Sequence, residues 1–84
     1  MAEVELTPDA LEQAAALPKR IKRQVRKVLE RLAKWPAVSG ARPLKGQLAG
    51  WFRLRTGDYR IRFRVHGETV IVDKIGHRRD IYED

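Results

Sequence analysis

The spacing of the apolar residues changes from a helical to a strand rhythm partway along the chain, and this change constrains the fold most. In one segment the apolar residues lie at i, i+4, i+7, i+8 and i+11, which is one face of a helix: Ile21, Val25, Val28, Leu29 and Leu32. From residue 51 onward apolar and polar residues alternate, as in a strand with one buried face. The sequence therefore predicts an α+β fold in which helices pack on a sheet.

A shorter helix is predicted ahead of this one. Thr7 offers an N-cap oxygen, and Pro8 suits the first helical position, where no N–H is needed. Pro18 ends this helix and begins the next, so the two helices should form a hairpin. The expected apolar stripe of the first helix consists of Leu11, Ala14, Ala15 and Leu17.

Strands are predicted on both sides of the hairpin. They cover, in chain order, residues 3–6, 51–55, 59–65 and 69–75, with a loop over 37–50 before the second. Gly57 and Asp58 suit a type II′ turn, which sets Leu54 opposite Ile61. We expect one domain over residues 1–84, with an N-terminal strand, the helical hairpin and a three-stranded antiparallel meander that together form one sheet packed on the helices.

The composition excludes several classes of protein. Eighty-four residues are too few for a large multidomain enzyme, and the absence of cysteine excludes disulfides and thiolate metal sites. No apolar run is long enough to cross a membrane, and residues 1–7 lack the regions of a secretory signal. We therefore expect a soluble, cytoplasmic protein. Its net charge of +7, with arginine as the commoner basic residue, favours an anionic partner.

Arginines on two neighbouring strands are predicted to share the sheet face opposite the apolar one: Arg53, Arg55, Arg60, Arg62 and Arg64. Like charges directly opposite each other destabilise a sheet, so this pattern suggests a binding role. Guanidinium groups bind phosphate bidentately and stay protonated, which suits a nucleic-acid backbone. The alternative is a solvated surface that Asp73 partly neutralises by pairing with Arg60 or Arg62. The basic face of the helix over 19–34 is likewise either solvated or a contact surface for nucleic acid or an acidic partner.

The tail after the last strand adds further reactive groups, and we expect them beside the same sheet: His77, Arg78, Arg79 and Tyr82. Cleavage of RNA without a metal requires a base for the 2′-hydroxyl, cations for the crowded phosphorane and an acid for the leaving 5′-oxygen. His77 can carry a proton near neutral pH, and Tyr82 can donate a proton or stack on a base. The histidines and carboxylates show no metal-ligand spacing, so no metal or cofactor is expected.

Three segments together resemble the RelE/ParE superfamily of toxins, in its RelE-like mRNA interferase branch. They are Leu-Lys-Gly at 44–46, the strands and turn over 51–61, and Ile-Gly-His-Arg-Arg-Asp-Ile-Tyr at 75–82. The resemblance covers essentially the whole chain and implies a β-α-α-β-β-β fold. It also implies the toxin of a type II toxin–antitoxin system, a ribosome-dependent endoribonuclease that cleaves mRNA in the 30S A site by metal-free attack of the 2′-hydroxyl.

The resemblance also implies roles for single residues. Arg60 and Arg78 match positions that hold the scissile phosphate or assist the leaving group, and Tyr82 matches a tail tyrosine that orients or stacks on the substrate. Arg53 stands where the ribonuclease branch often has a lysine that helps to deprotonate the 2′-hydroxyl. Arginine is a poor base, so His77 is the substitute candidate. The remaining basic residues are expected to bind RNA: Arg55, Arg62, Arg64, Lys45 and Arg79.

The expected protein partner is a cognate RelB-like antitoxin whose acidic and apolar segments cover the helix hairpin and approach the arginines. A heterotetrameric toxin–antitoxin complex is one assembly that the resemblance implies. The chain ends without the extra helix that some members use as a lid, so control by displacing such a helix is not expected. Two alternatives stay open, a ParE-type inhibitor of DNA gyrase on the same fold and a non-catalytic RNA- or ribosome-binding module.

Overall fold

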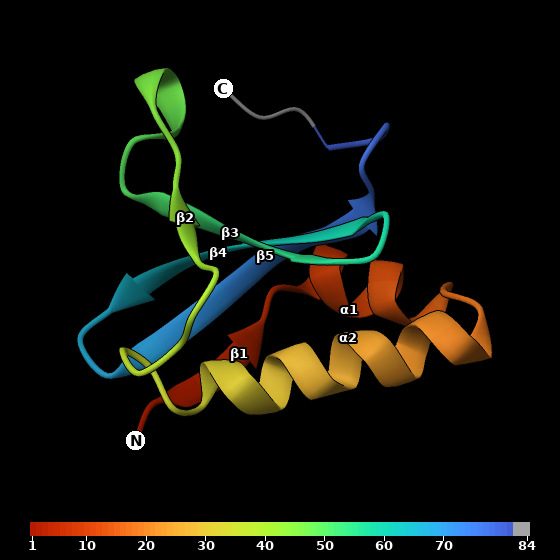
Figure 1. Cartoon of the computed structure of the whole chain (residues 1–84), viewed down its shortest axis with the longest axis horizontal. Coiled ribbons are helices and arrows are strands. Elements are labelled where there is room, and N and C mark those ends of the chain that lie inside the picture. The colour runs from red at the N-terminus through yellow and green to blue at the C-terminus, as the bar shows by residue number, and fades with distance from the viewer. Residues whose placement is uncertain (82–84) are drawn as a thin grey trace.

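A computed structural model of the chain describes residues 1–81, in which two helices cover one face of a mixed sheet (Figure 1). The predicted role of Tyr82 lies outside the described residues. The predicted α+β class and element order are confirmed. The elements are β1 (Glu3–Leu6), α1 (Pro8–Ala15), α2 (Lys19–Leu32), β2 (Arg42–Pro43), the 3₁₀ turn η1 (Gly46–Leu48), β3 (Trp51–Thr56), β4 (Tyr59–His66) and β5 (Thr69–His77).

Helix α1 begins as predicted but buries a different stripe. The Ala10 N–H donates to Thr7 Oγ1 at 3.2 Å, and Pro8 is the first helical residue. Ala10 is fully buried, whereas Leu11 is 58% exposed and Ala15 is exposed, so the predicted burial of Leu11 and Ala15 was wrong. This short helix meets the sheet along the line of residues 10, 14 and 17, and one residue further along an α-helix points about 100° away.

Helix α2 follows the predicted pattern closely. The buried residues on its inner face are Ile21, Val25, Val28 and Leu32, and Leu29 packs against the same core at partial burial. These side chains meet the apolar face of the sheet, where Leu54, Ile61 and Phe63 are almost completely buried. The strong helical periodicity therefore predicted both the helix and the face that it buries.

The strands form one sheet in the order β1-β5-β4-β3-β2 over the part of the chain that the structure describes. The hairpin of β3 and β4 has the predicted register, with Leu54 opposite Ile61, and a two-residue turn in which Gly57 adopts φ of +59°. However, β1 pairs with β5 in parallel, so the sheet is mixed and not purely antiparallel. The helix hairpin separates β1 from its partner, and local patterning carries no signal for a pairing so distant in sequence.

The segment over residues 37–50, predicted as a loop, contains β2 and η1. In β2, Arg42 lies opposite Arg53 and Pro43 opposite Phe52. This strand forms the edge of the sheet, where proline is tolerated because no outward N–H needs a partner. The loop prediction was therefore incomplete, since a two-residue strand leaves no alternating pattern to detect.

A bulge interrupts β5, which also extends two residues beyond its predicted end to His77. Arg62 pairs with Lys74 and Phe63 pairs with Val72, so Asp73 is the extra residue. Gln13 of α1 stabilises the distorted strand, because its Oε1 accepts a hydrogen bond from the Ile75 N–H at 2.8 Å. The bulge places the Asp73 carboxylate on the same side of the sheet as Arg62.

Candidate functional site

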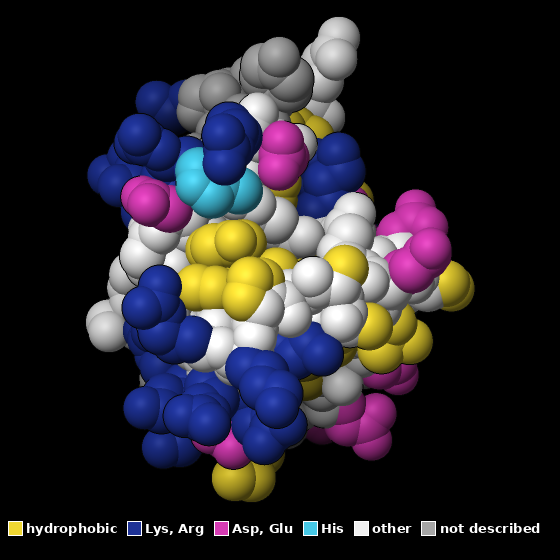
Figure 2. All heavy atoms as spheres, turned by 90° about the vertical axis from the view of Figure 1, so that its right-hand side faces the viewer, with side chains coloured by type: hydrophobic (Ala, Val, Ile, Leu, Met, Phe, Trp, Pro, Cys, Tyr) yellow, Lys and Arg dark blue, Asp and Glu magenta, His cyan; other side chains and the backbone are white. Residues whose placement is uncertain are grey.

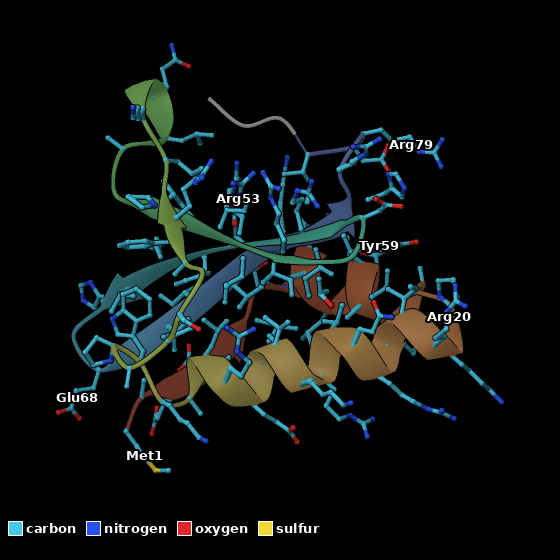
Figure 3. All side chains as sticks on the ribbon, viewed as in Figure 1. Met1, Arg20, Arg53, Tyr59, Glu68 and Arg79 are labelled. Carbon is cyan, nitrogen blue, oxygen red and sulfur yellow. The ribbon has the colours of Figure 1, made fainter. Side chains whose placement is uncertain are left out.

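The arginine face is the sheet surface that points away from the helices, as the labelled Arg53 does in Figure 3. Across the β3–β4 pair, Arg53 lies opposite Arg62 and Arg55 opposite Arg60, as the alternation predicts. Strand β2 adds Arg42, which lies opposite Arg53. Sequence analysis missed Arg42 because residues 37–50 carry no strand pattern.

Two arginines of this face are buried among like charges. Arg53 is 6% exposed and Arg60 is 8% exposed. Burial lowers the pKa of Arg53, and the charges of Arg55, Arg42 and Arg60 lower it further. Burial also lowers the pKa of Arg60, as do the charges of Arg55 and Arg78, while Asp58 raises it. Guanidinium groups stay charged under working conditions, so this part of the arginine face concentrates positive charge.

The turn between β3 and β4 brings Arg60 and Arg78 together. Arg60 Nη1 donates to the carbonyl oxygens of Gly57 at 3.2 Å and Tyr59 at 3.3 Å. The Arg78 N–H donates to the carbonyl oxygen of Asp58 at 2.7 Å. The effect of the Arg78 charge on the pKa of Arg60 agrees with this proximity. The Gly57-Asp58 turn therefore holds both arginines to which the family resemblance assigns the phosphate.

The tail after β5 folds onto the sheet through Ile81. Gly76 lies opposite Arg60, and a Cβ on Gly76 would lie 3.5 Å from Ile81 Cδ1. Ile81 is only 7% exposed, which makes it the apolar anchor of this segment. The signal that could have predicted the contact is Gly76 itself, because a glycine inside a strand often marks the close approach of another segment.

His77 lies on the other side of the sheet from Arg53. It pairs with Tyr59 in the β4–β5 register, and the two rings meet edge to face with centroids 5.4 Å apart. Both line a surface hollow beside the start of α2, which includes Arg20 and Gln24, and Figure 3 shows Tyr59 and Arg20 at this end of the molecule. His77 Nδ1 accepts a hydrogen bond from the Arg79 N–H at 3.3 Å. His77 therefore lies beside the same sheet but on its helix side, because strand parity after the bulge turns it away from the arginines.

The other predicted RNA-binding residues differ in whether they are paired or exposed. Arg62 donates from Nε and Nη2 to the Asp73 carboxylate at 3.0 and 2.5 Å, and this hydrogen bonding raises the pKa of Arg62. The predicted pairing of Asp73 is thus with Arg62. Arg64 is exposed, as are Lys45 beside η1 and Arg79 in the tail.

A second basic surface covers the outer side of α2. Figure 2 shows dark blue side chains in two groups at this end of the molecule, with a band of hydrophobic side chains between them, and the lower group lies over α2. The exposed basic residues of the helix are Lys19, Arg20, Lys22, Arg23, Arg26, Lys27 and Arg31. The helices thus separate this surface from the arginine face.

The described residues contain neither a metal-binding cluster nor a membrane-spanning helix. Among residues 1–81, no group of three or more histidine and carboxylate side chains lies close enough to hold a metal ion. Over the same residues, no helix is both long and apolar enough to cross a membrane.

The family to which the chain belongs follows from a match between its sequence and a family model. A model of the family described as the ParE toxin of the type II toxin–antitoxin system parDE matches residues 4–82. This chain belongs to that family. The predicted membership of the RelE/ParE superfamily is therefore confirmed.

Two curated toxins resemble parts of this ParE-family chain. Toxin RelG of Mycobacterium tuberculosis is 44% identical over 43 residues, which is 49% of each chain. Toxin RelE3 of Methanocaldococcus jannaschii is 42% identical over 33 residues, which is 39% of this chain and 38% of the relative. The matched stretches thus span about half or less of these relatives.

Solved structures match the ParE-family chain over more of its length. A chain of the toxin–antitoxin complex RelBE2 from Mycobacterium tuberculosis superposes with a TM-score of 0.79 and 30% identity, covering 92% of this chain and 91% of that one. The isolated RelE toxin of E. coli superposes with a TM-score of 0.77 at 20% identity, covering 92% of this chain and 84% of that one. At 20% identity, the similarity to the E. coli toxin shows a shared fold alone.

Proposed function

We propose that this ParE-family protein is a ribosome-dependent endoribonuclease that cleaves mRNA in the A site. The observation that carries the proposal is the gathering of Arg53, Arg55, Arg60 and Arg78 on one face, with two of them buried. Several guanidinium groups on one face match a ligand with several negative charges, because each of them can bind a phosphate through two hydrogen bonds. An RNA backbone is such a ligand, and RelG and RelE3 are toxins with RelE-type names.

In the proposed reaction the 2′-oxygen attacks the neighbouring phosphorus. The new bond joins the 2′-oxygen to phosphorus, the bond to the 5′-oxygen breaks, and the products carry a 2′,3′-cyclic phosphate and a 5′-hydroxyl. The 2′-hydroxyl proton goes to a base, and the leaving oxygen receives a proton. The phosphorane carries more negative charge than the starting phosphate, so Arg60 and Arg78, held by the Gly57-Asp58 turn, would bind it more tightly than the substrate.

We attribute most of the rate enhancement to stabilisation of the phosphorane's negative charge. We assign no general base among residues 1–81. Arg53 stays protonated and serves as a phosphate ligand. His77 packs against Tyr59 on the helix side, which argues against it as the base. Tyr82 stays our candidate for orienting or stacking on the substrate.

The test is cleavage in a reconstituted translation system. Purified protein is added to ribosomes programmed with a defined message, and cuts are mapped by primer extension. We expect cuts at the A-site codon, and Arg78→Ala should slow them by about 100- to 1,000-fold because one charge-stabilising group is lost. Arg23→Ala removes the same charge from α2, where the side chain is exposed, and is the matched control.

A second candidate, inhibition of DNA gyrase, is favoured by the family description, which names the parDE system. The absence of cuts by the folded protein, together with gyrase-dependent DNA cleavage, would replace the ribonuclease proposal with this one. RNA binding without any cuts and without gyrase inhibition would favour a non-catalytic binding module. Equal losses in Arg78→Ala and Arg23→Ala would contradict the assignment of Arg78 to the reacting phosphate.

We also propose an antitoxin as the protein partner, bound in the groove between α1 and α2. Apolar side chains line this groove, and Lys22 and Arg26 border it. The apolar residues are Ala14, Ala15, Leu17, Val25 and Leu29. An amphipathic segment with acidic residues along its edges complements such a surface, and its charge would also bring it to the basic face of α2.

A further inference from the structure

Trp51 is an aromatic residue on the arginine face. It is the first residue of β3 and has the same strand parity as Arg53, so it points away from the helices. It lies directly opposite Arg64 on β4, and its side chain is partly exposed. The guanidinium carbons of Arg62 and Arg64 lie over the indole ring, 5.0 and 5.6 Å from its centroid. These distances are those of cation–π contacts.

The surroundings of Trp51 hold the ring in place. Asp73 binds Arg62 through two hydrogen bonds, and both side chains are largely buried, at 15% and 18% exposure. Arg62 is therefore a fixed support on which the indole rests. Arg64, in contrast, is exposed and can reach a ligand beside the ring.

Packing of the hydrophobic core does not explain why a tryptophan occupies position 51. Trp35 packs edge to face against Phe52 and Phe63, with ring centroids 5.0 and 5.4 Å away. Among the residues described, Trp35 is part of the group packed against the hydrophobic core and Trp51 is not. A large aromatic side chain placed on the polar face of the sheet, beside two guanidinium groups, serves a contact outside the core.

We propose that Trp51 and Arg64 form a stacking subsite for an unpaired base of the RNA strand bound on the arginine face. The inference rests on the proposed function for the presence of that strand. Indole and guanidinium planes are the groups on which proteins stack splayed-out bases. Arg60 and Arg64 are four residues apart on β4, about 13 Å. The stacked base is therefore not next to the phosphate held by Arg60, and the subsite contributes to binding of the strand.

Tryptophan fluorescence reports this contact directly. The chain contains two tryptophans, so Trp35→Phe leaves Trp51 as the emitting residue and keeps an aromatic ring in the core. A short oligouridine RNA should quench this emission. Inorganic polyphosphate, which offers phosphates without bases, should bind the arginines and leave the emission largely unchanged. Equal responses to RNA and polyphosphate would overturn the stacking subsite.

Two substitutions then measure how much the indole ring of Trp51 contributes to RNA affinity. Trp51→Ala should weaken oligouridine binding by about 5- to 150-fold, the range measured for stacking residues, and leave polyphosphate binding unchanged. Trp51→Phe keeps an aromatic plane and should retain most of the RNA affinity. In the ribosome assay, Trp51→Ala should raise KM far more than it lowers kcat.

The outcomes separate this inference from the proposed function. Quenching by RNA in a protein that cuts no message would retain the subsite and reject the ribonuclease. Normal cleavage with unchanged KM and RNA affinity in Trp51→Ala would reject the subsite and retain the ribonuclease. If Trp51→Ala fails to fold, Trp51→Phe and the emission of the Trp35→Phe protein still decide the question.

Discussion

In β5 the bulge inserts Asp73 between two residues that pair with β4, and its carboxylate binds both Nε and Nη2 of Arg62. A regular strand would have put consecutive side chains on alternate faces. The extra residue instead adds an acceptor to a face otherwise dominated by cations. At the residue scale, this one ion pair gives Arg62 a supporting role under Trp51, different from that of the arginines gathered around Arg60.

Asp73→Asn tests the strength of that support. The amide keeps the shape of the side chain but loses its charge and one acceptor, so the free energy of unfolding should fall by about 1 to 3 kcal/mol. Urea denaturation measures the change. Glu68→Gln, at an exposed turn position, is the control and should shift the free energy by less than about 0.5 kcal/mol. A similar shift in both variants would show that the Asp73 pair contributes no more than a surface charge.

At the element scale, the helix hairpin presents two surfaces with different chemistry. Its inner side supplies the core, and the groove between α1 and α2 stays accessible with an apolar floor and basic edges. Leu11 is exposed because α1 turns Ala10 to the sheet instead. The hairpin therefore has apolar surface left over after the core is complete, as expected of an element that binds another chain.

Ala15→Glu tests the groove as the antitoxin site. Ala15 is exposed and lines the groove, so a glutamate there should leave the fold intact and weaken antitoxin binding at least tenfold by steric and charge conflict with an acidic segment. Titration calorimetry with the antitoxin encoded by the neighbouring gene measures the affinity. Ala16→Glu places the same side chain one residue further on, outside the groove lining, and should bind nearly normally. Equal affinities for both variants would contradict the proposed groove.

At the scale of the whole molecule, the net charge of +7 is divided between two surfaces on opposite sides of the fold. The arginine face concentrates charge by burial, whereas the basic residues of α2 stay in solvent. A surface of the first kind releases more free energy when an anion binds, because the repulsion between its groups is less screened by water. We therefore expect single-stranded RNA to prefer the arginine face.

The salt dependence of RNA binding tests this preference. Arg53 and Arg60 and the arginines whose charges act on one or both of them make a set of five among the described residues: Arg42, Arg53, Arg55, Arg60 and Arg78. If each neutralises one phosphate, log K should fall with log salt concentration with a slope of about −3.5 for a single strand. Fluorescence anisotropy over a salt series measures the slope. Arg55→Gln should reduce its magnitude by about 0.7, and Arg23→Gln on α2 should not. The reverse result would move the RNA to α2.

Much of the fold and part of the site could be predicted from the sequence. Helix faces and strand faces repeat over a few residues, so α2, the β3–β4 register and the row of arginines are all local patterns. The pairing of β1 with β5, the strand β2 and the bulge at Asp73 depend on segments distant in sequence, and no local pattern records them. The side of the sheet on which His77 lies could not be predicted for the same reason, because its parity depends on the bulge.

By itself, the sequence determined which residues of β3 and β4 could reach the arginine face, since strand alternation and a two-residue turn leave each of their side chains only one side of the sheet. Tertiary structure alone decided how these groups act. It buried Arg53 and Arg60, joined Arg78 to Arg60 through the Gly57-Asp58 turn, and brought Ile81 against Gly76. Burial and proximity are properties of contacts between distant segments, and the strength of a charge in a protein depends on both.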